Sequence, residues 1–175
     1  MRKVRNKSAA APRQAFGLVE VMIVLVCLAM IAAVAMSTFG SPHVQRLRGA
    51  TQILTADLDF ARVGALANAA DPYVLVFDAD GRGYHIGVRS TPDTPIVHPG
   101  TGEPYIVQFG QGRAHHLAGV SIDSLQIGDD RMLGFGSFGQ LDPEMPATLT
   151  LNSGDRSVTV SLDPVTGEAA VGEVQ

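Results

Sequence analysis

The sequence has little of what a small protein uses to fix its fold covalently. Of its 175 residues only Cys27 is a cysteine, and none is a tryptophan. No disulfide can form within a chain that has one cysteine, so any globular part must fold on its apolar core alone. Lysine is also scarce, because none occurs after Lys7.

Acidic residues are confined to one part of the chain, whereas basic residues are concentrated in its first 15 positions. Residues 1–15 hold five basic residues and no acid, whereas the remainder holds eight arginines and all 17 acidic residues, a net charge of −9. An acidic globular part is a poor candidate for holding nucleic acid by bulk charge. The distribution therefore predicts a basic leader followed by an acidic domain.

Residues 16–36 form a long apolar run, FGLVEVMIVLVCLAMIAAVAM, in which only Glu20 is charged. The run is about as long as a helix that crosses a bilayer core. A charge inside such a segment costs roughly 2.5–3.5 kcal/mol on insertion scales, which favours a functional role for Glu20 over a glutamate that merely reaches toward interfacial water. A secretory signal peptide is the alternative, but the run is longer than a usual h-region and no A-x-A-like site closes it.

A basic leader, a small residue before phenylalanine and a glutamate five residues into the apolar run occur in that order. This arrangement resembles the prepilin signal of type IV pilins and type II secretion pseudopilins. The resemblance implies that a prepilin peptidase cleaves between Ala15 and Phe16 and that Phe16 is N-methylated. It also implies that Glu20 pairs with the N-terminal amine of a neighbouring subunit during assembly. The chain departs from the family in having Ala15 where glycine is preferred.

A second helix is predicted after Gly40-Ser41-Pro42, since Pro42 kinks or ends the first one. Apolar and small residues recur there at three- and four-residue steps, and charged residues, Asp57 among them, are placed mostly between them. The periodic positions are Val44, Leu47, Ala50, Thr51, Leu54, Leu58, Ala61 and Ala65. This helix is predicted to continue to about Ala69, before Asp71-Pro72, as the second half of a long, bent helical segment.

From Tyr73 onward the pattern changes to short β-rich runs separated by turns. Strands are predicted at 73–78, 84–88, 105–109, 120–127, 132–138, 147–152, 157–162 and 168–171, with a hairpin joining the first two. Residues 90–104 contain four prolines and predict an exposed loop. Many short strands with regular turns indicate an antiparallel sheet packed as a sandwich or partial barrel.

The sequence thus predicts an α+β fold in which a long N-terminal helix, transmembrane and then amphipathic, packs on an antiparallel β-sheet sandwich. The order of the predicted elements, a helix first and then a β-rich domain, resembles that of the H-type minor pseudopilins, the GspH/FimT-like branch. The resemblance rests on Leu54-x3-Leu58-x2-Ala61-Arg62 with Val74–Phe77, and on Leu133-Gly134-Phe135 with the strands that follow. The predicted parts are a basic prepilin leader (1–15), a transmembrane and assembly helix (16–39), its amphipathic second half (40–70) and a β-rich globular domain (71–175).

Other motifs in the sequence favour structural interpretations. The pattern GxGxxG in residues 134–139 precedes no helix, as a dinucleotide site requires, and is interpreted as a glycine-bent strand and turn. Residues 78–81 resemble the start of a calcium loop, but Arg89 falls where the bidentate glutamate is needed. The pair His115-His116 lacks a third metal ligand at useful spacing, and Cys27 is placed on the apolar helix. No catalytic, cofactor or metal site is therefore predicted.

The predicted function is that of a non-enzymatic minor pseudopilin or minor pilin that supports protein secretion. The expected location is the inner membrane, as a single-pass protein with its leader in the cytoplasm and its domain in the periplasm. Expected partners are other pilins or pseudopilins, a prepilin peptidase and an inner-membrane assembly platform. Two alternatives stay open: a minor pilin for DNA uptake, although only the scattered Arg113, Arg131 and Arg156 are available, and a bitopic anchor whose β domain binds a ligand.

Overall fold

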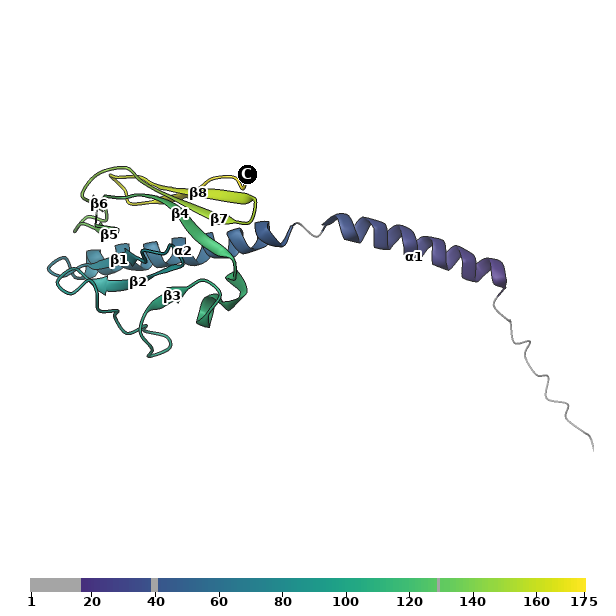
Figure 1. Cartoon of the computed structure of the whole chain (residues 1–175), viewed down its shortest axis with the longest axis horizontal. Coiled ribbons are helices and arrows are strands. Elements are labelled where there is room, and N and C mark those ends of the chain that lie inside the picture. The colour runs from purple at the N-terminus through teal and green to yellow at the C-terminus, as the bar shows by residue number, and fades with distance from the viewer. Residues whose placement is uncertain (1–16, 39–40, 129) are drawn as a thin grey trace, which may run out of the picture. The chain divides into compact units, whose positions relative to one another are not determined.

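The computed structural model describes residues 17–38, 41–128 and 130–175, with residues 34–38 described as backbone only. The chain divides into two units, Met1–Gly40 and Ser41–Gln175, and Figure 1 labels most of their helices and strands. The predicted cleavage pair, Ala15 and Phe16, lies outside the described residues.

The first unit consists of one helix, α1 (Leu18–Thr38). Its sequence contains neither proline nor glycine, the two residues that most disfavour a helix interior. Apolar side chains cover every side of the helix and are exposed within this chain. No helix of the described residues meets the combined length and hydropathy expected of a membrane span.

The second unit begins with helix α2 (Pro42–Ala67), which is capped by Ser41. The Ser41 hydroxyl accepts a hydrogen bond from the Val44 amide at 3.4 Å, and Pro42 occupies the start of the helix, where its missing N–H costs nothing. Pro42 therefore begins α2. The prediction from the sequence was that Pro42 kinks or ends the first helix. The helix ends at Ala67, where the Asn68 amide donates to the Gly64 carbonyl at 2.9 Å.

Nine strands form two antiparallel sheets in the described residues. The five-stranded sheet has the order β3-β2-β1-β5-β6 and the four-stranded sheet the order β4-β7-β8-β9. The strands of the first are β1 (Tyr73–Phe77), β2 (Gly83–Val88), β3 (Ile106–Gln108), β5 (Met132–Phe135) and β6 (Leu141–Asp142). Those of the second are β4 (Val120–Gln126), β7 (Ala147–Ser153), β8 (Arg156–Leu162) and β9 (Ala169–Val171).

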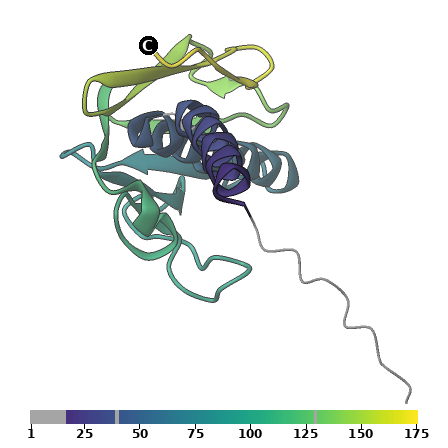
Figure 2. The same cartoon turned by 90° about the vertical axis from the view of Figure 1, so that its right-hand side faces the viewer.

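Helix α2 contacts strands of both sheets and lies between them, as Figure 2 shows. Its buried face presents Leu47, Leu54 and Leu58 to a single core. Small residues at Ala50, Ala61 and Ala65, also fully buried, let the sheets approach the helix closely. The strand periodicity matches this arrangement, because β7 alternates buried and half-buried residues along its whole length.

The predicted α+β class, with a long helix packed on antiparallel sheets, is confirmed, and the predicted hairpin of β1 and β2 pairs Tyr73 with Val88 through Phe77 with Tyr84. The strand expected at 132–138 stops at Phe135. It stops because residues 136–139 form a turn in which the Gly139 amide donates to the Gly136 carbonyl at 2.9 Å and Gly139 has φ +83°. Strand β6, only two residues long, was missed.

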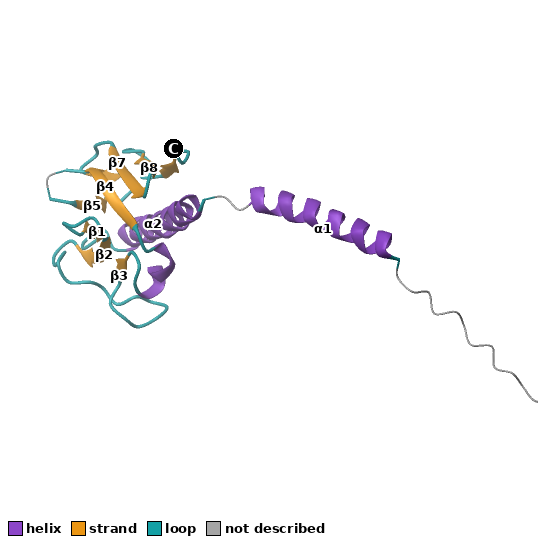
Figure 3. Ribbon diagram, turned by 45° about the vertical axis from the view of Figure 1, so that its right-hand side comes forward, coloured by secondary structure: helices purple, strands orange, loops and turns teal. Residues whose placement is uncertain are grey.

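The proline-rich segment 90–104 is mostly exposed, as expected, but it is tied to the sheet at Ile96. The Ile96 amide donates to the Ile86 carbonyl at 2.8 Å, and the Tyr105 amide donates to the Ile96 carbonyl at 2.7 Å. A short 3₁₀ helix, η1 (Gly112–Leu117), follows β3 and was not expected. Figure 3 shows this helix beside α2, with the long loop next to it.

Candidate functional site

Glu20 lies in the first turn of α1. The Glu20 amide donates to the Gly17 carbonyl at 3.0 Å, and the Val21 amide donates to the same oxygen at 3.3 Å. Glu20 itself is exposed. A carboxylate in the first turn of a helix is stabilised by the partial positive charge of the helix N-terminus.

Apart from Glu20, the side chains of α1 from Leu18 to Ala33 are apolar and exposed. Its large exposed residues are Leu18, Val19, Val21, Met22, Ile23, Val24, Leu25, Val26, Leu28, Met30 and Ile31, and Cys27 is an exposed free thiol among them. A helix that is apolar on all sides is stable only in apolar surroundings, such as lipid or a bundle of similar helices. Glu20 is therefore a charged group at the start of a helix whose other side chains, as far as Ala33, are unfavourable in water.

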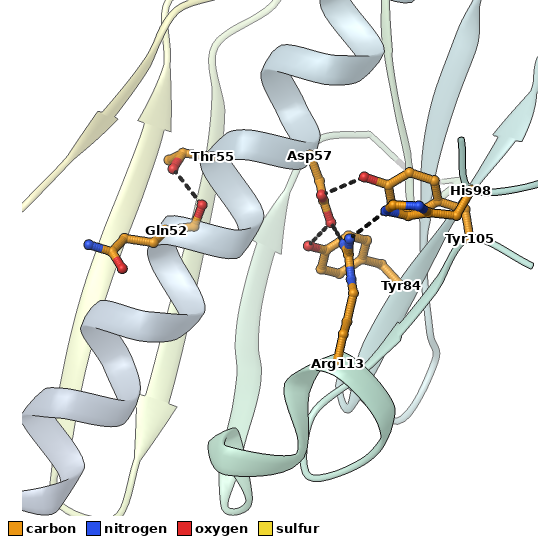
Figure 4. Close-up of polar contacts among 7 residues, drawn as sticks. All are labelled: Gln52, Thr55, Asp57, Tyr84, His98, Tyr105 and Arg113. Carbon is orange, nitrogen blue, oxygen red and sulfur yellow. Dashed lines mark hydrogen bonds and ion pairs between the residues drawn. The ribbon is translucent and has the colours of Figure 1, made fainter. Parts of the chain in front are cut away.

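A second polar site lies inside the globular unit, around Asp57 of α2 (Figure 4). Asp57 is only 3% exposed. Its Oδ2 accepts a hydrogen bond from Tyr84 Oη at 2.7 Å, its Oδ1 accepts one from Tyr105 Oη at 2.8 Å, and the Arg113 guanidinium donates to Oδ2. The site thus joins α2 to β2, to the residue before β3, and to η1.

Three donors for one carboxylate compensate for the burial of its charge. A buried carboxylate without such partners would cost several kcal/mol, roughly the desolvation penalty of a single ion. The Arg113 side chain remains one-third exposed and keeps part of its hydration. The Arg113 Cζ also lies 4.7 Å from the centre of the Tyr105 ring, which adds a cation–π contact.

The surroundings shift the pKa values of the cluster. Burial raises the pKa of Asp57 above its usual value, although the Tyr84 hydrogen bond and the Arg113 charge oppose this. Burial, together with the Asp57 charge, raises the pKa of Tyr84 well above its usual value. Burial alone would lower the pKa of Arg113, but the Asp57 carboxylate and Tyr105 outweigh it and raise that pKa. Both tyrosines and Arg113 therefore stay protonated at neutral pH.

Aromatic stacking extends the cluster to the proline-rich loop. The His98 ring lies 4.4 Å from the Tyr105 ring, centre to centre, and Tyr105 in turn lies 5.3 Å from Phe60 of α2. His98 Nε2 is also 3.3 Å from Arg113 Nη1. The loop, η1 and α2 are consequently held together through Asp57 and Tyr105, which is a structural role.

Sequence reasoning missed this cluster by assigning Asp57 to the polar side of its helix. The spacing contained the signal, because Asp57 lies three residues after Leu54 and four before Ala61, both of which are fully buried. Arg113 was interpreted as one of several scattered arginines. Its partner could not be identified from the sequence, since 56 residues separate Arg113 from Asp57.

The other candidate motifs lie in turns, in β5 and in η1. Residues 78–81 turn the β1–β2 hairpin, with the Gly81 amide donating to the Asp78 carbonyl at 3.1 Å. The glycines of residues 134–139 lie in β5 and its turn, and no helix begins there. His115 and His116 lie in η1. No group of three potential metal ligands occurs in the part of the chain that the structure describes.

Comparison with known proteins adds evidence for both units. Residues 11–36 match the family model of the prokaryotic N-terminal methylation motif. The type IV minor pilin FimU of Pseudomonas aeruginosa strain PAO1, in its P21 crystal form, is similar with a TM-score of 0.51 and 20% identity, over 74% of this chain and 90% of that chain. The chain therefore has a pilin-like fold. The P65 crystal form of FimU gives a TM-score of 0.49 and 18% identity, over 73% of this chain and 93% of the FimU chain.

No curated protein matches the pilin-like chain significantly. At 20% identity the similarity to FimU establishes the fold alone. The methylation motif implies an inner-membrane-anchored prepilin with a periplasmic domain, processed by a prepilin peptidase and assembled with other pilins. Such a protein is structural and not an enzyme.

Proposed function

We propose that the pilin-like chain is a minor subunit of a filament, either the pseudopilus of a type II secretion system or a type IV pilus. Within that class we assign it to the H-type minor pseudopilins. The observation that carries the proposal is the combination in one chain of a methylation motif over residues 11–36 with a pilin-like domain. The H-type assignment rests on the Leu54 to Arg62 pattern in α2 and on the glycine turn after β5.

Assembly follows from the chemistry of Glu20. Residues 16–39 hold the mature subunit in the inner membrane, with the domain in the periplasm. Cleavage between Ala15 and Phe16 creates a positively charged amine at the start of each subunit. A carboxylate and an ammonium are each costly in an apolar bundle and much less costly as a pair, so Glu20 pairs with the amine of the subunit ahead. The inner-membrane platform then moves the helix into the filament.

Processing at Ala15–Phe16 is tested by the intact mass of protein extracted from membranes. The mature chain should begin at N-methylated Phe16, and the same protein from a strain without prepilin peptidase should keep residues 1–15. A full-length species in a strain with active peptidase would contradict the proposal and favour a simple membrane anchor, the bitopic alternative.

Pairing by Glu20 is tested by the variants Glu20→Ala and Glu20→Gln. Both should insert into the membrane at least as well as the wild type, because the apolar run loses its charge. Both should be depleted from sheared filaments relative to the inner membrane. Met22→Leu, an apolar exchange on the same helix, is the matched control. Wild-type amounts of both variants in filaments would exclude pairing, unless mutation of the corresponding glutamate in the major subunit shows that this subunit begins the filament.

The DNA-uptake alternative requires a basic surface, and each of the three arginines considered for it has an acidic or carbonyl neighbour within the domain. Arg113 pairs with Asp57, Arg131 Nη1 donates to the Asp78 carbonyl at 3.3 Å, and Arg156 Nε lies 3.9 Å from the Asp155 carboxylate. With a net charge of −9 after the leader, we expect no salt-dependent DNA binding by residues 41–175. Binding that weakens steeply with added salt would restore this alternative.

A further inference from the structure

Four large apolar side chains are exposed at one end of the globular unit. We name them the end patch: Val63 and Leu66 at the end of α2, Phe138 in the β5–β6 turn and Val165 in the β8–β9 turn. Phe138 is 87% exposed and Val165 is 64% exposed. Folding of the isolated chain gives no reason for an aromatic ring to face water so completely.

The three segments that carry the end patch touch one another. A Cβ added to Gly139 would lie 3.8 Å from Leu66 Cδ2, so the β5–β6 turn covers the end of α2. The Leu141 amide donates to the Pro164 carbonyl at 2.9 Å, and Gly167 packs against the Gly139 carbonyl. The four exposed side chains therefore lie on segments that adjoin one another at one end of the domain.

Arg62 places a positive charge at the same surface. Its Nε is buried beneath the β5–β6 turn, 3.1 Å from where a Cβ of Gly139 would lie, and has no hydrogen-bond partner. No ion pair among the described residues includes Arg62. The chain from Phe16 onward is strongly acidic, so an unpaired guanidinium framed by apolar side chains differs from its surroundings in charge and in polarity.

The end patch lies at the end of α2 that is opposite to its connection with the first unit. Leu66 lies about 37 Å along the axis of α2 from Ser41, the residue through which the first unit is attached. Figure 1 shows β5 and β6 at this end of α2. The surface is therefore separate from the N-terminal end of α2, where the apolar α1 is connected.

We propose that the end patch is the docking surface for another protein subunit whose contact surface is apolar and carries a carboxylate that pairs with Arg62. Apolar residues at the contact remove the four exposed side chains from water, and a guanidinium binds a carboxylate through parallel hydrogen bonds. A lipid surface fits less well, because anionic membranes are held by clusters of basic residues and this surface has one arginine in an acidic domain. The proposal rests on the filament function proposed above, since that function supplies neighbouring subunits.

Site-specific photo-crosslinking of the full-length protein in its own membrane tests the proposal. Benzoylphenylalanine at position 138 should give an adduct of defined mass with another pilin of the same machine, identified by mass spectrometry. The same probe at position 97 is the control, because Val97 is 66% exposed on the proline-rich loop. No protein adduct at position 138 above that at position 97, or adducts with lipid only, would overturn the proposal.

Substitutions then separate the apolar from the charged part of the surface. Phe138→Ser should lower recovery in sheared filaments by about tenfold, as expected for loss of an aromatic anchor, whereas Val97→Ser should leave it unchanged. Arg62→Glu should abolish the crosslink at position 138, and exchange of the crosslinked partner's carboxylate for a lysine should restore it. An unchanged thermal unfolding midpoint for each variant excludes loss of the fold as the cause.

Failure of this proposal differs from failure of the proposed function. If Glu20→Ala is lost from filaments while Phe138→Ser is retained and position 138 gives no crosslink, the end patch is not a docking surface and the filament function stands. If position 138 crosslinks to a protein while the leader is never removed, the docking surface stands and the filament function does not.

Discussion

Tyr84 Oη donates a hydrogen bond of 2.7 Å to Asp57 Oδ2 in the interior of the domain, where both residues are almost completely buried. This bond connects α2 with β2, and the same carboxylate also holds Tyr105 and Arg113. One aspartate therefore links three segments that are 27 to 56 residues away from it in the sequence.

Asp57→Ala should lower the free energy of unfolding by about 3 kcal/mol, because it leaves Arg113 without its carboxylate and two buried hydroxyls without an acceptor. Urea denaturation of residues 41–175 provides the measurement. Asp59→Ala, an exposed aspartate on the same helix, should change the stability by less than about 0.5 kcal/mol. Equal effects of the two substitutions would show that the Asp57 cluster does not stabilise the fold.

The Asp57 cluster also predicts a pH dependence of a definite sign. Because burial raises the pKa of Asp57 in the folded state, the folded protein binds a proton that the unfolded protein releases, from the ordinary value of 3.8 up to the raised one. This proton linkage thus favours the folded state fully below that window, and its contribution is lost as the pH rises through it. The difference in unfolding free energy between wild type and Asp57→Asn, measured from pH 3 to 7, should follow this course. A difference that increases toward neutral pH would have the opposite sign and would exclude it.

Gly64→Ala should destabilise the domain, although alanine is usually favoured over glycine within helices by about 1 kcal/mol. A Cβ at Gly64 would lie 2.2 Å from Cδ2 of Tyr73, whose ring stacks on Phe60, so the Tyr73 ring would have to move away from the helix and from Phe60. We expect a loss of about 1–3 kcal/mol. Gly49→Ala is the control, because its nearest neighbour is the tip of Leu117 at 3.1 Å. Its loss in the same denaturation assay should be smaller.

Residues 41–175 should form a soluble, monomeric domain when separated from the first unit, because the core is contained within them. Removal of residues 45–69 from that fragment should cause aggregation, since the inner faces of both sheets would lose the helix that covers them. Size-exclusion chromatography of the two fragments measures the difference. Equal solubility and equal cooperative unfolding would mean that α2 is not part of the core.

Features that depend on short-range periodicity could be predicted from the sequence. The three- and four-residue steps from Leu47 to Ala65 predict the buried face of α2, and alternation in residues 147–162 predicts the β7–β8 pair. The pairing of Asp57 with Arg113 could not be predicted, because it depends on how the two sheets and η1 are arranged around α2. Likewise, the sequence gives no indication that Phe138 and Val165 share a surface, since that depends on contact between two turns.

The position of α2 between the two sheets also determines how the domain resists mechanical load. In the described residues no strand of one sheet pairs with a strand of the other. Strands of both sheets contact α2 instead. Consider tension applied at Ser41 in the direction of the axis of α2. It must therefore slide Leu47, Leu54 and Leu58 past both sheets together, and close-packed side chains oppose such shear along the whole length of the helix. A pull from the N-terminal side thus loads many contacts in parallel and does not open the sheets strand by strand.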